Sequence, residues 1–156
     1  MLGIDYGRRR IGLAISDATG MLARPWKTVP SAGAPGRVAR VLAAEVAMLA
    51  VEADGLGAVV IGLPRRLSGE PNAQTAVVQE VAAELRALIG VPVVLQDERL
   101  TSVEAESRLA RTEKNWRTRK PLVDAAAAAI ILQDYLDAEA DRRRWHDVES
   151  EGGVEE

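Results

Sequence analysis

Residues 2–17 read LGIDYGRRRIGLAISD, and this stretch decides the fold. Residues 1–4 predict a buried strand that ends at Asp5, residues 6–9 a tight turn, and residues 11–15, where apolar and small side chains alternate, the returning strand of a hairpin. A carboxylate at the end of a buried strand needs hydrogen-bond partners or a cation. The glycines of this stretch leave room for an anionic group such as phosphate to approach Asp5. The alternative is a structural Asp that closes the turn through backbone N–H groups.

The composition limits what this acid can do. The chain has 156 residues, of which 47% are hydrophobic, which is enough for one domain with its own core. The absence of cysteine excludes disulfides, thiolate catalysis and thiolate-bound metal sites. No apolar run approaches the roughly 20 residues of a membrane span, and no secretory signal is recognisable. We therefore expect a cytoplasmic protein without membrane contact.

Charge is distributed unevenly along the chain. The formal net charge is -3, yet residues 147–156 (DVESEGGVEE) hold five of the 23 acidic side chains and none of the 20 basic ones. The remainder is therefore mildly basic. We expect one domain over residues 1–146, followed by a disordered acidic tail over residues 147–156.

Beyond residue 17 the chain alternates between strand and helix patterns. Short apolar runs predict strands, and apolar residues that recur every three or four positions predict amphipathic helices. The expected elements are strands over residues 21–26, 58–63 and 91–96, and helices over residues 37–53, 72–89, 101–111 and 121–144. This alternation, without an internal repeat, predicts a single α/β domain.

Acidic residues follow two of the predicted strands. Asp5 ends the first strand, and the pair Asp97-Glu98 comes directly after the run VPVVLQ. Ligands of open α/β sheets bind beyond the carboxyl ends of the strands, so we expect these acids at one edge of the sheet.

A third acid, Asp124, lies in the expected first turn of the last helix. Because helical neighbours stand three or four residues apart, it shares a face with small and apolar residues, namely Ala127, Ala128, Ile131 and Tyr135. A charge on such an inward face needs a cation. The alternative is a capping role at the helix N-terminus.

Three converging carboxylates, in a chain with no cysteine and one histidine, suit Mg²⁺ or Mn²⁺. Two such ions activate a water molecule and stabilise the leaving oxygen when a phosphodiester is cleaved. His146 lies beside the acidic tail, so we expect it to be solvated rather than to act as a general base.

Four segments stand in the order and spacing of the YqgF or RuvX family, within the ribonuclease H-like superfamily. The segments are GIDYGRRRIGLAISD, VIGLPRRLSGE, QDERLTSVEAE and KPLVDAAAAAIILQDYL, and the resemblance covers residues 1 to about 137. It implies an α/β, ribonuclease H-like fold, with a mixed five-stranded sheet flanked by helices. It also implies that Asp5, Glu98 and Asp124 are the catalytic acids and hold one or two Mg²⁺ or Mn²⁺ ions, with Asp97 as a supporting or substitute ligand.

Clustered basic side chains are candidates for contact with nucleic acid, although a solvated surface is the alternative for each cluster. The candidates are Arg9, Arg10, Arg65, Arg66, Arg117, Arg119 and Lys120. Arg99 follows Glu98 and either orients the acids or contacts the substrate. Trp116 either stacks on an unpaired base or packs in the core.

The sequence therefore predicts a metal-dependent hydrolase, a nuclease. By resemblance its substrate is RNA, at the 5′ end of precursor 16S rRNA, and its partners include pre-ribosomal particles. Because the helices carry one-sided apolar stripes, we expect a monomer or a weak dimer. Three alternatives remain: a Holliday junction resolvase acting on DNA, a catalytically inactive nucleic-acid-binding module, and an ATP-binding protein of the actin and sugar-kinase class. The length of the chain and the missing repeat argue against the last.

Overall fold

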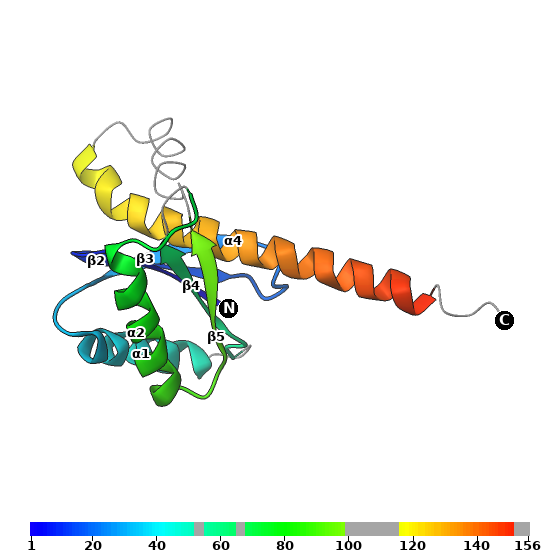
Figure 1. The fold of residues 1–156 in the computed structure, drawn as a ribbon, viewed down its shortest axis with the longest axis horizontal. Coiled ribbons are helices and arrows are strands. Elements are labelled where there is room, and N and C mark those ends of the chain that lie inside the picture. The colour runs from blue at the N-terminus through cyan, green and yellow to red at the C-terminus, as the bar shows by residue number, and fades with distance from the viewer. Residues whose placement is uncertain (52–54, 65–67, 99–115, 152–156) are drawn as a thin grey trace.

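A computed structural model describes residues 1–51, 55–64, 68–98 and 116–151. Five strands form one sheet, and helices cover both of its faces (Figure 1). In chain order the elements are β1 (Leu2–Tyr6), β2 (Arg10–Ser16), β3 (Ala23–Pro30), α1 (Pro35–Ala50), β4 (Val59–Pro64), α2 (Ala73–Leu88), β5 (Val93–Glu98) and α4 (Trp116–Glu151). The helix expected over residues 101–111 lies outside the described residues.

The sheet has the order β3-β2-β1-β4-β5, which confirms the mixed five-stranded sheet. β1, β2 and β3 pair antiparallel, so the predicted hairpin is present, with Asp5 opposite Gly12. β4 and β5 run parallel to β1. The carboxyl ends of β1, β4 and β5 therefore lie at the same edge of the sheet.

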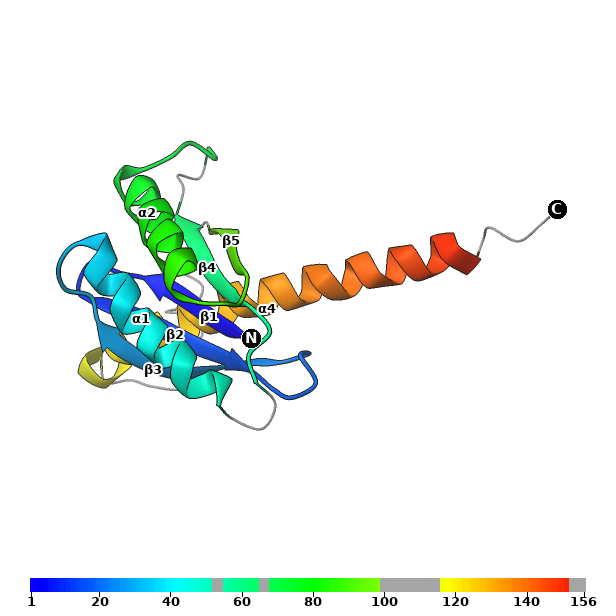
Figure 2. The same ribbon diagram turned by 90° about the horizontal axis from the view of Figure 1, so that it is seen from below.

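Two apolar layers hold the helices on the sheet. On one face, β-strand residues such as Ile4 and Ile61 pack with α1 and α2. On the other, Ala14 and Val60 pack against the middle of α4. Figure 2 shows the same arrangement from below, with α1 and α2 in front of the sheet and α4 behind it.

α2 begins as the sequence suggests, at a residue suited to capping. The Asn72 side chain accepts hydrogen bonds from the backbone N–H groups of Gln74 and Thr75. The Thr75 hydroxyl accepts one from the Asn72 N–H in return, at 2.8 Å. This reciprocal pair satisfies donors that a helix start otherwise leaves without partners.

α4 is longer than predicted at both ends. It begins at Trp116, so Pro121 lies inside the helix rather than at its start. It also continues to Glu151, past the predicted end near residue 144. Ion pairs three residues apart, Arg142 with Glu139 at 2.5 Å and Arg144 with Asp141 at 3.8 Å, favour helix there. Residues 147–151 are thus helical instead of forming the start of a disordered tail.

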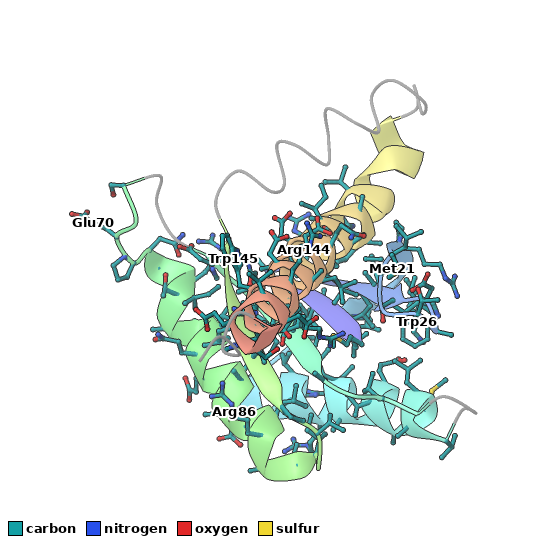
Figure 3. All side chains as sticks on the ribbon, turned by 90° about the vertical axis from the view of Figure 1, so that its right-hand side faces the viewer. Met21, Trp26, Glu70, Arg86, Arg144 and Trp145 are labelled. Carbon is teal, nitrogen blue, oxygen red and sulfur yellow. The ribbon has the colours of Figure 1, made fainter. Side chains whose placement is uncertain are left out.

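The outer part of α4 projects away from the sheet (Figures 1 and 2). All residues from 140 to 150 are exposed, including Trp145, whose exposed fraction is 71%. Figure 3 looks towards this end of the helix and shows Arg144 and Trp145 on it. In the part of the chain that the structure covers, no helix is long and apolar enough to cross a membrane.

Candidate metal and nucleic-acid site

Asp5 lies on the face of the sheet that α4 covers. Its neighbour two positions back, Gly3, shares that face, and a Cβ atom built on Gly3 would lie 2.7 Å from the Cβ of Leu132 in α4. Asp5 is 8% exposed, which makes it one of only two buried polar residues among those described. Asp5 is thus a buried acid one position before the end of β1, which continues to Tyr6 rather than ending at Asp5.

Gly12 allows the backbone of Asp124 to approach the strand that pairs with β1. It stands directly opposite Asp5 in the hairpin, and a Cβ atom built on it would lie 1.8 Å from the main-chain oxygen of Asp124. The backbone of α4 at Asp124 therefore rests on Gly12, where no larger residue fits. Asp5 and the backbone of Asp124, which are far apart in the sequence, thus both adjoin Gly12 of β2.

The Asp124 side chain has an ionic partner. Arg10 Nε donates a hydrogen bond to Asp124 Oδ2 at 3.0 Å, and the two side chains are 31% and 27% exposed. Arg10 precedes Gly12 by two positions on β2, so both residues belong to the face that α4 covers. Because α4 begins at Trp116, Asp124 is well inside the helix, and the alternative of an N-terminal capping role is wrong.

The pleat of β5 separates Asp97 from Glu98. Asp97 stands level with Leu63, which packs in the core beneath α1 and α2, so Asp97 belongs to that face of the sheet. Position 98, level with Pro64, alternates to the face of Asp5 and Asp124. The structure thus places Asp97, which is exposed, on the opposite face from Asp5 and Asp124.

The predicted basic residues are placed only in part. Arg9 is exposed in the turn between β1 and β2, close in sequence to Asp5. The backbone of α4 includes positions 116, 117, 119 and 120, at its first two turns. The candidates Arg65, Arg66 and Arg99 lie outside the described residues. For Arg10 the structure gives a contact with a predicted catalytic acid, Asp124.

Sequence reasoning missed the pairing of Arg10 with Asp124. The stretch GRRRIG contains three consecutive arginines. Arg10 differs from Arg8 and Arg9 because β2 begins at Arg10, whereas the other two lie in the turn. The alternation from Arg10 to Gly12 was the available signal, because both fall on one face of the strand.

The donors fit a divalent metal ion. Carboxylate oxygens are the ligands that Mg²⁺ and Mn²⁺ prefer, and Asp5 and Asp124 supply them from one face of the sheet. Among the side chains that the structure describes, no three acidic, histidine or cysteine residues are close enough to hold a metal ion. A third ligand from position 98 would complete the set.

The mixed sheet, with an acid on its central strand and a helix bearing a second acid across it, defines a protein of the ribonuclease H-like class. The model of the RuvX family, described as Holliday junction resolvase, matches residues 1–138. The chain belongs to the RuvX family.

Two proteins similar to this chain share one name. A protein of Chloroflexus aggregans is 44% identical over 138 residues, which cover 88% of this chain and 93% of that protein. One of Leifsonia xyli is 43% identical over 150 residues, which cover 95% and 93%. Both are named "Putative pre-16S rRNA nuclease". A solved structure, T. thermophilus RuvC in complex with Holliday junction substrate, aligns with a TM-score of 0.49 at 18% identity over 89% of this chain and 94% of that one.

Proposed function

We propose that this protein is a divalent-metal-dependent nuclease that hydrolyses phosphodiester bonds in RNA, at the 5′ end of precursor 16S rRNA. The observation that carries the proposal is that the buried Asp5 and the backbone of Asp124 both adjoin Gly12. The names of the similar proteins support the substrate. We further propose that the protein acts in the cytoplasm on pre-ribosomal particles, as a monomer or a weak dimer.

In this proposal Asp5, Asp124 and Glu98 hold one or two Mg²⁺ or Mn²⁺ ions. The bound metal supplies an activated water and stabilises the leaving oxygen of the phosphodiester. The protein contributes the positions of the ligands, which β1, β5 and α4 fix from three parts of the chain. Asp97 lies on the other face and is left out of this ligand set.

We propose that basic residues that follow the carboxyl ends of the strands bind the substrate. Arg9 is exposed in the turn that follows β1, and we propose that it contacts a backbone phosphate. We propose that the remaining candidates also bind the substrate: Arg65, Arg66, Arg99, Trp116, Arg117, Arg119 and Lys120.

A second candidate substrate is a DNA four-way junction, which the description of the family model favours. A resolvase cuts two symmetry-related strands, so it needs two active sites at a fixed distance, as a dimer provides. Cleavage of RNA ends makes no such demand.

The test compares a precursor 16S rRNA fragment with a mobile four-way DNA junction, each with Mg²⁺, Mn²⁺ or a chelator. We expect metal-dependent cleavage of the RNA that the chelator abolishes, at a higher rate than cleavage of the junction. Paired, symmetric nicks in the junction at a rate above RNA cleavage would replace this proposal with the resolvase. The variant Asp5→Asn controls for contaminating nucleases.

A further inference from the structure

Arg10 occupies a position where a metal ion would compete with it. Its Nε lies 3.0 Å from Asp124 Oδ2, and Asp124 is one of the proposed metal ligands. The contact is charge-assisted, since a guanidinium cannot lose its proton in a protein. The carboxylate that the metal needs is thus already bound to a cation.

This cation balances a concentration of negative charge. Asp5 is 8% exposed, and the backbone of Asp124 rests on the glycine opposite it. Negative charges in a partly buried site repel more strongly than in water. A positive side chain from the adjacent strand reduces that repulsion while no metal is bound.

The backbone also fixes where the arginine starts. Arg10 pairs with Pro30 of β3 at the beginning of β2, and Gly12, two positions on, lies under Asp124. The guanidinium therefore reaches Asp124 from a strand built into the sheet rather than from a loop. This makes Arg10 a permanent neighbour of the site.

We propose that Arg10 is a placeholder cation: it neutralises Asp124 in the metal-free protein and gives up the carboxylate when a divalent ion binds. The inference rests on the proposed function, in which Asp124 holds metal. It assigns Arg10 a role in metal loading that differs from a plain phosphate contact. Removing Arg10 then destabilises the metal-free protein but strengthens metal binding, because one positive charge no longer opposes the ion.

The test uses the full chain with Arg10→Gln, Arg10→Lys and the matched control Arg9→Gln, which removes an equal charge from the neighbouring exposed position. Melting temperature is measured in chelator, and Mn²⁺ affinity by calorimetric titration. We expect Arg10→Gln to melt a few degrees lower in chelator and to bind Mn²⁺ about tenfold more tightly. Arg10→Lys, which keeps the charge, should stay near wild type in Mn²⁺ affinity, and Arg9→Gln near wild type in both measurements.

A double variant protects the test against general destabilisation. If Arg10 acts through Asp124, the change Arg10→Gln should lower the melting temperature much less in an Asp124→Asn background. Weaker or unchanged Mn²⁺ binding by Arg10→Gln, with wild type binding normally, would overturn the inference alone. A wild-type protein that binds no Mn²⁺ would overturn the proposed metal site itself, so the two failures are distinguishable.

Discussion

Gly12 controls how closely α4 approaches the sheet, and with it the position of Asp124. A Cβ atom there would lie 1.8 Å from the Asp124 main-chain oxygen, a distance that no side chain tolerates. We therefore expect Gly12→Ala to push α4 away and to lower the free energy of unfolding by about 1–3 kcal/mol or more. Urea denaturation followed by circular dichroism measures this, and cleavage activity should fall with it.

The control is Gly57→Ala, since nothing lies within 4 Å of a Cβ atom built on Gly57. This variant should unfold close to wild type. A similar decrease in stability in both variants would mean that glycine flexibility, rather than the close contact with α4, explains the effect at Gly12.

At the residue scale, the positions of the acids could be predicted and their surroundings could not. The end of an apolar strand identified Asp5, and helical spacing placed Asp124 on the packed face of α4, where Ala127 and Ala128 are fully buried. The choice between Asp97 and Glu98 depends on the pleat of β5, which needs the strand register. The contact of Arg10 depends on a tertiary approach of α4 that local patterns do not contain.

At the scale of elements, α4 combines a packed middle with an exposed end. Ile131 is 2% exposed against the sheet, whereas Trp145 is 71% exposed beyond it. We expect Ile131→Ala to cost about 2–5 kcal/mol of stability because it leaves a cavity. Trp145→Ala, although it removes a larger side chain, should change stability by less than about 0.5 kcal/mol. Chemical denaturation measures both, and a large decrease for Trp145→Ala would show that the outer end of α4 is covered in solution.

Local patterns predicted most elements because each has its own periodicity. The hairpin alternates, the run AVVIGL is apolar throughout as a central strand requires, and α1 shows a one-sided stripe ending in Leu49. The predicted ends of α4 differ from the observed ones. Pro121 suggests a helix start, and the acidic residues after position 146 suggest a tail. Neighbouring charges of opposite sign, such as Glu139 and Arg142, instead continue the helix.

At the scale of the whole molecule, strand order is the least local property. Nothing in the separate segments states that β4 joins β1 in parallel on the side away from β2. The resemblance to a family supplied the mixed five-stranded sheet, and the residues alone supplied an α/β domain. The sheet in turn brings Asp5, position 98 and Asp124 to one face, which no single segment encodes.

The proposed nucleic-acid surface also belongs to this scale. If Arg117, Arg119 and Lys120 bind phosphates, replacing all three with Ala should lower the salt slope of single-strand binding by about 0.7 per phosphate that the protein no longer neutralises. Fluorescence anisotropy at several salt concentrations measures the slope. The matched control replaces Arg142, Arg143 and Arg144, three exposed arginines on the projecting part of α4. Equal salt slopes for the two triple variants would mean that the first turns of α4 do not contribute to the nucleic-acid-binding surface.

We propose that acids from three parts of the chain form a metal-dependent nuclease site on the face that α4 covers. The most direct test is Mn²⁺-dependent cleavage of a precursor 16S rRNA fragment by wild type, Glu98→Gln and Asp97→Asn, which change two successive positions of β5. We expect Glu98→Gln to lower the rate more than about a hundredfold and Asp97→Asn to stay near wild type. Full activity in Glu98→Gln, or a lower rate in Asp97→Asn than in Glu98→Gln, would contradict it.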